Sequence, residues 1–189
     1  MNSLIRLSKF SLLIIIALAA NSAHGQDKES NNPYAGLPFK DRLFFGGDLG
    51  LSFGTITYIR IAPIIGFNVS PKFSVGAGPS YQYYKDNRFI GLESSIYGGS
   101  VFGRYFVIEN IFLQTEFEVL NLDELYYNPT SDYIPDRVTI PVWFVGAGLS
   151  QRTPNGSGFF IGVFYDLIGD INSPYPSDIA VRAGGMISF

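Results

Sequence analysis

Apolar and polar side chains alternate along most of this chain with a period of two residues. In the segment 42–54, for example, Leu43, Phe45 and Leu49 occupy odd positions, and Asp48 lies between them. This is the period of a β-strand whose two faces differ in polarity. Eight segments share the pattern, and the sequence predicts a strand in each: 42–54, 57–69, 72–85, 93–107, 111–122, 138–150, 158–168 and 178–189.

Two of these segments, 93–107 and 138–150, carry large apolar side chains at both odd and even positions. We assign the odd positions to the apolar outer face here too, because this choice puts Arg104 on the polar face and Trp143 on the apolar one. The same choice predicts that several large apolar side chains face inward: Ile96, Phe102, Phe106, Ile140, Val142 and Phe144.

The connections between the segments alternate in length. Tight turns rich in Pro, Asn and Gly are predicted at 68–72, 108–110 and 152–157. Longer links are predicted at 85–92, 123–137 and 169–177, while the first link of this set, around 54–56, is short. Short turns at one rim and longer loops at the other are typical of outer-membrane barrels, whose turns are periplasmic.

Composition excludes an ordinary water-facing surface and a bundle of spanning helices. Charged residues make up 15% of the chain and aromatic residues 16%. Glycines interrupt the apolar segments, and no apolar stretch after residue 25 reaches the roughly 20 residues of a spanning helix. In lipid the remaining architecture is a closed barrel. The sequence therefore predicts an all-β protein: an eight-stranded antiparallel up-and-down transmembrane β-barrel.

The alternative is a soluble barrel with an apolar interior, such as a lipocalin-like ligand carrier. Its outer face would be rich in Lys and Glu, whereas the polar face of this chain is mostly Gly, Ser and Ala. A membrane barrel further predicts two girdles of outward aromatic residues. These are Phe45, Phe67, Phe73, Tyr105, Phe159 and Phe189 near the turns, and Phe53, Tyr81, Tyr83, Tyr97 and Tyr165 near the longer links.

Residues 1–25 have the pattern of a secretory signal peptide. Arg6 and Lys9 precede an apolar run, 11–20, and small residues at Ala23 and Gly25 precede a cleavage site before Gln26. A membrane anchor is the alternative, but the run is short for one. Removal of the signal leaves 11 of 13 basic residues against 16 acidic ones, a net charge of −5, which argues against nucleic-acid binding. We predict residues 26–41 as a periplasmic lead-in and 42–189 as the barrel domain.

Three stretches carry a resemblance to a known family: the signal peptide ending at 25–26, the Phe-Gly-Arg-Tyr-Phe segment 102–106, and the terminal 186–189. The chain resembles the outer-membrane protein β-barrel domain family of small eight-stranded barrels, and more loosely the OmpA and OmpX type of membrane domain. The resemblance implies an outer-membrane location and insertion by the barrel-assembly machinery, which would read Gly185, Ile187 and Phe189. Because the chain stops at the last predicted strand, we expect no appended peptidoglycan-binding domain.

Charged residues on the polar face would lie in the lumen. An eight-stranded barrel has room for side chains but not for an open channel, and buried charges need partners. We therefore expect a plugged lumen in which Arg104 pairs with Glu116 or Glu118. A gated proton or ion path is the alternative. The predicted lumen network is Asp48, Arg60, Arg104, Glu116, Glu118, Asp166 and Arg182.

The residue types present argue against catalysis. The chain has no cysteine, and its one histidine, His24, leaves with the signal peptide, so a Ser/His pair is impossible. Glu116 and Glu118 are spaced i, i+2 on one strand face, which could bring two carboxyls together, but alternation in a polar lumen explains the spacing as well. We predict no enzyme activity, no cofactor and no metal.

The link 123–137 is the other candidate site. It holds four acidic residues and three tyrosines, and Tyr126, Tyr127, Asp132 and Tyr133 are candidate contacts for a surface partner. The alternative is a loop that is only solvated. The sequence predicts a monomer in outer-membrane lipid with a structural or surface-interaction role in envelope integrity or adhesion. A small-solute or ion pore is the second hypothesis and a lipid-modifying enzyme the third.

Overall fold

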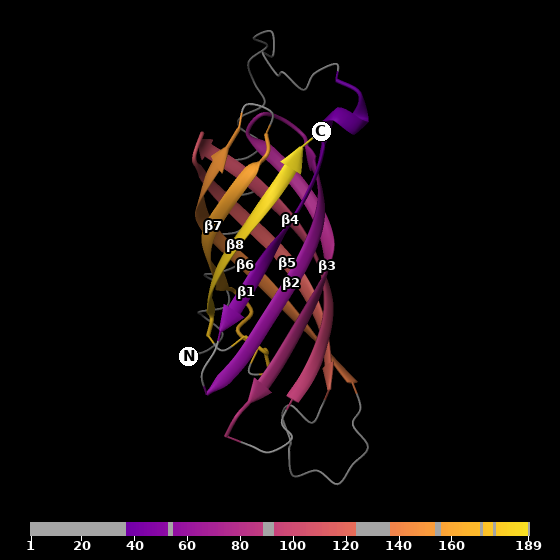
Figure 1. The fold of residues 1–189 in the computed structure, drawn as a ribbon, viewed down its shortest axis with the longest axis vertical. Coiled ribbons are helices and arrows are strands. Elements are labelled where there is room, and N and C mark those ends of the chain that lie inside the picture. Colours follow the sequence, from indigo (N-terminus) through magenta and orange to yellow (C-terminus); the bar gives the residue numbers. More distant parts are fainter. Residues whose placement is uncertain are drawn as a thin grey trace, which may run out of the picture. The chain divides into compact units, whose positions relative to one another are not determined.

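Eight strands form a closed barrel in chain order, each antiparallel to its neighbours (Figure 1). The structure is a computed structural model, and it describes residues 37–52, 55–88, 93–123, 137–153, 156–170, 172–175 and 177–188. The predicted eight-stranded antiparallel up-and-down barrel is confirmed. The strands are β1 (Leu43–Ser52), β2 (Ile56–Asn68), β3 (Phe73–Asp86), β4 (Glu93–Ile108), β5 (Ile111–Asp123), β6 (Arg137–Arg152), β7 (Gly158–Asp166) and β8 (Ile179–Ser188).

Each of the eight predicted segments becomes a strand, with bounds that differ by at most two residues from the prediction. The predicted ends at residues 53, 54 and 189 lie outside the described residues, as does the predicted signal peptide 1–25. The predicted lead-in is described from Leu37 onward, where a 3-10 helix, η2 (Phe39–Arg42), precedes β1. Among the described residues, no helix has the length and apolar character needed to cross a membrane.

The parity assigned from the sequence holds in every strand. Even-numbered side chains face the interior and odd-numbered ones face outward, except at the end of β4, where the register shifts and Ile108 is exposed. The two ambiguous segments follow the same rule, since Arg104 is 2% exposed and Phe144 is fully buried. Every predicted girdle residue that the structure describes lies on the outer face. The barrel therefore has an apolar exterior, and the charged residues of its strands are concentrated inside.

Two glycines make room for interior rings. A Cβ at Gly66 would lie 2.0 Å from Cζ of Phe44, and a Cβ at Gly148 would lie 2.4 Å from Cζ of Phe112. No side chain fits at those distances, so each ring packs directly against the backbone of a neighbouring strand. These pairs fill the lumen near the short turns.

The barrel closes between its first and last strands. β1 and β2 are paired from Leu43 to Ser52 over ten residues, whereas β1 and β8 are paired over six, from Phe44–Ser188 to Leu49–Ala183. Closure is thus complete at the end that carries the short turns. At the other end, β1 continues beyond Leu49 and β8 begins before Ala183 without a β1–β8 pair among the described residues.

Candidate functional site

The lumen contains three layers of side chains, ordered along the strands from the short turns to the longer links. The central charged layer comprises Asp48, Arg60, Glu116, Glu118 and Arg182, which come from β1, β2, β5 and β8. An aromatic layer on the turn side comprises Phe44, Phe102, Phe106, Phe112, Phe160 and Met186. An aliphatic layer on the link side comprises Ile96, Leu120, Leu122, Ile140 and Val142.

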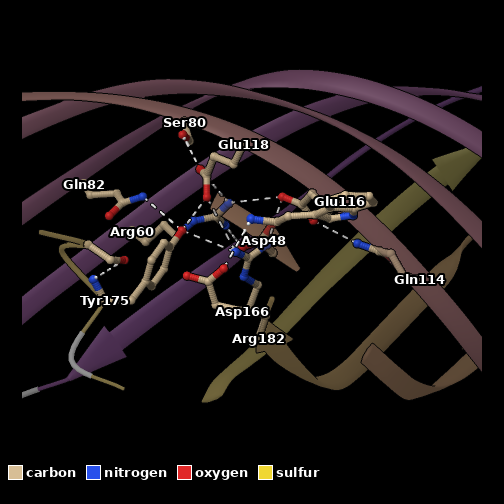
Figure 2. A network of polar contacts seen from close by, with 12 residues as sticks. Asp48, Arg60, Ser80, Gln82, Gln114, Glu116, Glu118, Asp166, Tyr175 and Arg182 are labelled. Carbon is tan, nitrogen blue, oxygen red and sulfur yellow. Dashed lines mark hydrogen bonds and ion pairs between the residues drawn. The ribbon is translucent and has the colours of Figure 1, made fainter. Parts of the chain in front are cut away.

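Arg60 occupies the middle of the charged layer and contacts three carboxylates (Figure 2). Nη1 donates a hydrogen bond to Asp48. Nη2 lies 3.3 Å from Oε1 of Glu118 and 3.7 Å from Oε1 of Glu116. The side chain is 1% exposed, so its charge depends on these partners rather than on water.

Arg182 reaches the same two glutamates from β8. Nη1 donates to Oε1 of Glu116 at 2.9 Å, and Nη2 lies 3.6 Å from Oε2 of Glu118. Its guanidinium also lies over the ring of Phe144, with 4.4 Å between the central carbon and the ring centroid. The two glutamates, neighbours on one face of β5, are therefore bridged by two arginines from other strands.

Two neutral hydroxyl groups also donate hydrogen bonds to the carboxylate of Glu118. Ser80 donates to Oε1 at 2.7 Å, and the hydroxyl of Tyr175 donates to Oε2. Tyr175 also accepts hydrogen bonds from Gln82 at 3.1 Å and from Arg182 at 3.3 Å. Its ring packs edge-on against Phe144, with 5.0 Å between the centroids.

Tyr175 was missed by the sequence reasoning. It belongs to the link between β7 and β8, which the sequence identifies only as one of the longer connections. Strand alternation says nothing about a link residue, because its direction depends on how the link folds back. The structure places the Tyr175 hydroxyl inside the charged layer, where it closes the polar network on the link side.

The predicted partner of Arg104 is corrected by the structure. Nε of Arg104 donates to Oε1 of Gln114 at 2.7 Å, and Nε2 of Gln114 donates to Glu116 at 2.9 Å, so the amide stands between the arginine and the carboxylate. Arg60 and Arg182 take the glutamates instead. Arg104 lies one step nearer the turns, where its guanidinium is 4.4 Å from the ring centroid of Phe160 and 4.6 Å from that of Phe112.

Asp166 faces inward as predicted, but its hydrogen bonds are to the backbone. Its Oδ1 accepts hydrogen bonds from the backbone N–H groups of Ile168 at 2.9 Å and Trp143 at 3.3 Å. It therefore fixes the point at which β7 ends and the last link begins. Five of the seven predicted network residues form direct ion pairs, Arg104 joins them through Gln114, and Asp166 has a local role.

Chemically, this arrangement holds charge in place and offers little access to a substrate. Glu116 is 4% exposed and Glu118 is 0% exposed, and both are held in ion pairs. In the part of the chain that the structure describes, no group of three or more His, Cys, Asp or Glu side chains is placed to hold a metal ion.

The other predicted site residues are only partly within the described chain. Ile187 is 63% exposed and Gly185 is also on the outer face of β8, whereas Phe189 lies outside the described residues. The candidate loop contacts Tyr126, Tyr127, Asp132 and Tyr133 lie outside them too. The base of that loop is described: Nη1 of Arg137 donates to Asp123 at 2.7 Å, joining the ends of β5 and β6.

Comparison with known proteins finds a likeness to solved structures. No family model matches the sequence, and no curated protein matches it. The structure is similar to a crystal structure of the N-terminal β-barrel domain of Pseudomonas aeruginosa OprF, with a TM-score of 0.46 and 12% sequence identity over 78% of this chain and 95% of that one. A likeness of this size says nothing about function.

Proposed function

We propose that this protein is an outer-membrane β-barrel with a closed lumen and a structural or surface-interaction role. The observation that carries the membrane placement is the polarity of the wall. Outward residues such as Leu51, Val181 and Ile161 are apolar and more than half exposed, while Arg60, Arg104 and Arg182 face inward. Water would favour the opposite arrangement, and lipid favours this one.

The layered interior supports a plug rather than a pore. The charged layer lies between an aromatic layer and an aliphatic layer, so an ion would have to pass both. The cavity beside Asp48, Arg104 and Glu116 has a volume of about 10 Å³, which is at the lower limit for a single water molecule. The fully paired carboxylates likewise favour a structural role over acid–base catalysis, and we propose no enzyme activity.

Membrane insertion can be tested by gel migration. The purified protein folded in phosphatidylcholine vesicles should migrate differently before and after boiling, and protease added outside the vesicles should leave the strands intact. Complete digestion, with identical migration in both states, would contradict the membrane placement.

Conductance separates the plug from the pore. In planar bilayers the protein should produce no stable current steps, because an ion would have to pass the aromatic and the aliphatic layers that the described strands place in the lumen. A variant with a shortened aromatic layer, Phe112→Ala with Phe160→Ala, is the matched control that opens space on the turn side. Reproducible steps from the unaltered protein would overturn the closed-lumen proposal.

The surface role rests on the link between β5 and β6. Its base is fixed by the Arg137–Asp123 pair and by a hydrogen bond from Arg137 to the backbone oxygen of Asn121 at 2.8 Å. Deletion of residues 126–135 should therefore leave the barrel folded. We expect cells displaying the deletion variant to lose adhesion to a host or matrix surface that the intact protein supports. Equal adhesion by cells displaying the intact protein and the deletion variant would contradict the surface role.

A further inference from the structure

The wall of the barrel is split between β1 and β8 at the link side. Continuing the register from Leu49–Ala183 would pair Gly50 with Arg182 and Leu51 with Val181. The structure forms neither pair, although all four residues are described and belong to strands. β1 is held here only by β2, and β8 only by β7, so the two strands diverge where a barrel normally continues its hydrogen-bond ladder.

A pocket of about 210 Å³ occupies this split. It is lined by residues of both faces of the wall: Leu51, Ile179 and Val181 face outward, and Arg60 and Arg182 face the lumen. One cavity is therefore bordered by residues from both faces of the wall and by the link residues Tyr175 and Ser177. Its outer rim is apolar, since Leu51 and Val181 are each 61% exposed, and its inner end reaches the charged layer beside Tyr58 and Tyr175.

The inner end has hydrogen-bond donors that the protein does not satisfy. Among the buried side-chain polar atoms of the described residues, Nε of Arg60 and Nε of Arg182 have no hydrogen-bond partner. Both residues line the pocket, and both are at least 97% buried. An arginine N–H is a donor only, so each needs an acceptor oxygen. An unmet donor is especially costly in a wall surrounded by lipid.

We propose that the split between β1 and β8 binds the carboxyl group of a fatty acid that enters from the lipid. The acyl chain would lie along the apolar rim at Leu51, Ile179 and Val181, and the carboxyl oxygens would accept hydrogen bonds at the inner end from Arg60 and Arg182. This proposal rests on the membrane placement proposed above, because only then does the rim face lipid.

Size and charge select this head group. A volume of 210 Å³ is below the roughly 300–1,000 Å³ of whole-ligand pockets, so it suits a small head group with the chain left outside. A phosphate-bearing glycerolipid head would be larger. An amine would bring further donors, whereas the unmet groups of the two arginines at the inner end are donors themselves. A carboxyl group brings two oxygens, and in its protonated form it adds no charge to the paired network.

The experiment is photo-labelling in phosphatidylcholine vesicles. The full-length protein is labelled with palmitic acid that carries a diazirine near the carboxyl end, and the labelled residues are located by mass spectrometry. Hexadecylamine and hexadecanol with the same diazirine are the head-group controls. We expect the acid to label residues 49–51 and 179–182 roughly tenfold more than the amine does, about the effect of one hydrogen bond to a charged group.

Two variants test the site without disturbing the ion pairs. Ala180→Phe places a ring in the pocket from its inner face, and Ala147→Phe adds the same ring to the exposed outer face of β6. Ala180→Phe should reduce labelling at the split about tenfold, and Ala147→Phe should leave it unchanged. In Leu51→Cys with Val181→Cys, a disulfide should abolish labelling and its reduction should restore it; the chain has no native cysteine to interfere.

The outcomes separate this proposal from the membrane placement. Equal labelling around all outward strands, with no enrichment at the split, would overturn the fatty-acid site and leave the membrane barrel intact. Equal labelling by acid and amine would show an acyl groove without carboxyl recognition and would also overturn the proposal. Absence of labelling on every outward strand would contradict the membrane placement itself.

Discussion

The lumen accommodates buried arginines in two different ways. In the charged layer, Arg60 and Arg182 are neutralised by Asp48, Glu116 and Glu118 through direct ion pairs. In the aromatic layer, Arg104 lies among ring faces and donates to one neutral amide, Gln114. The first arrangement depends on complementary charge, and the second on packing and weak electrostatic attraction to aromatic faces.

This difference shows that burial alone does not determine how strongly a charged side chain interacts with the residues around it. All three arginines are 3% exposed or less. Removing a partner in the charged layer leaves an uncompensated charge, whereas changes around Arg104 remove ring contacts and leave no opposite charge behind. Substitutions in the two layers should therefore lower the free energy of unfolding by different amounts.

The largest effect is expected in the charged layer. Glu118→Gln keeps the shape of the side chain but leaves Arg60 and Arg182 with less negative charge nearby. We expect the free energy of unfolding to fall by about 3–5 kcal/mol, as for other broken buried ion pairs. The measurement is urea unfolding in phosphatidylcholine vesicles, followed by the fluorescence of Trp143, the only tryptophan of the chain.

The matched control is Glu93→Gln. Glu93 pairs with Lys85 at 3.8 Å, with both side chains about half exposed, so its loss should cost about 1 kcal/mol or less. Similar costs for the buried and the exposed substitution would mean that water reaches the charged layer.

A smaller effect is expected around Arg104. Arg104→Lys keeps the charge but loses the planar group that stacks on Phe112 and Phe160, and should lower the free energy of unfolding by about 1–2 kcal/mol. Arg104→Met should cost a similar amount or less, because no carboxylate is left directly unpaired. The same vesicle unfolding assay applies. If Arg104→Met lowered the free energy of unfolding as much as Glu118→Gln does, the two layers would not differ in how strongly they depend on their arginines.

The smallest effect concerns a charge pair at the rim, outside both layers. Arg88 donates to Asp86 through Nε at 3.0 Å, Nη2 at 2.6 Å and the backbone N–H at 2.9 Å, and these hydrogen bonds lower the pKa of Asp86. A lowered pKa in the folded state means that the stabilisation is present above the ordinary aspartate pKa and is lost as pH falls below about 4.

That pH dependence can be isolated with Asp86→Asn. Between pH 6 and pH 3, the unaltered protein should lose slightly more stability than this variant, measured by the same fluorescence assay. Identical pH profiles would show that the rim pair does not contribute.

The fold was largely predictable because the barrel wall is a single sheet, in which the alternation of apolar and polar residues assigns each side chain to one of two faces. Each strand residue faces either the outside of the barrel or the lumen, so one choice of parity placed Arg60, Arg182, Glu116 and Glu118 together inside. The choice also resolved β4 and β6, where apolar residues occupy both faces. Their inward residues fill the aromatic and aliphatic layers of the lumen, which explains why those two strands are less clearly amphipathic.

The partners within the lumen were less predictable. The sequence predicted that Arg104 forms an ion pair with Glu116 or Glu118, because a short turn joins β4 to β5. In the barrel, Arg104 lies directly opposite Gln114 on β5, and Glu116 lies opposite Phe102. Arg60 and Arg182 reach the glutamates across the lumen from strands that are distant in sequence, a proximity that arises only on closure.

By itself, the sequence determined the strand count, the inward and outward faces and most of the buried charges, because these follow from local period and composition. Only the tertiary structure decided which charges meet, that Tyr175 folds into the charged layer, and that β1 and β8 part near Arg182. Those features depend on register, on the path of a link and on the closing of the first strand against the last. They are relations between distant segments, which a pattern of neighbouring residues does not contain.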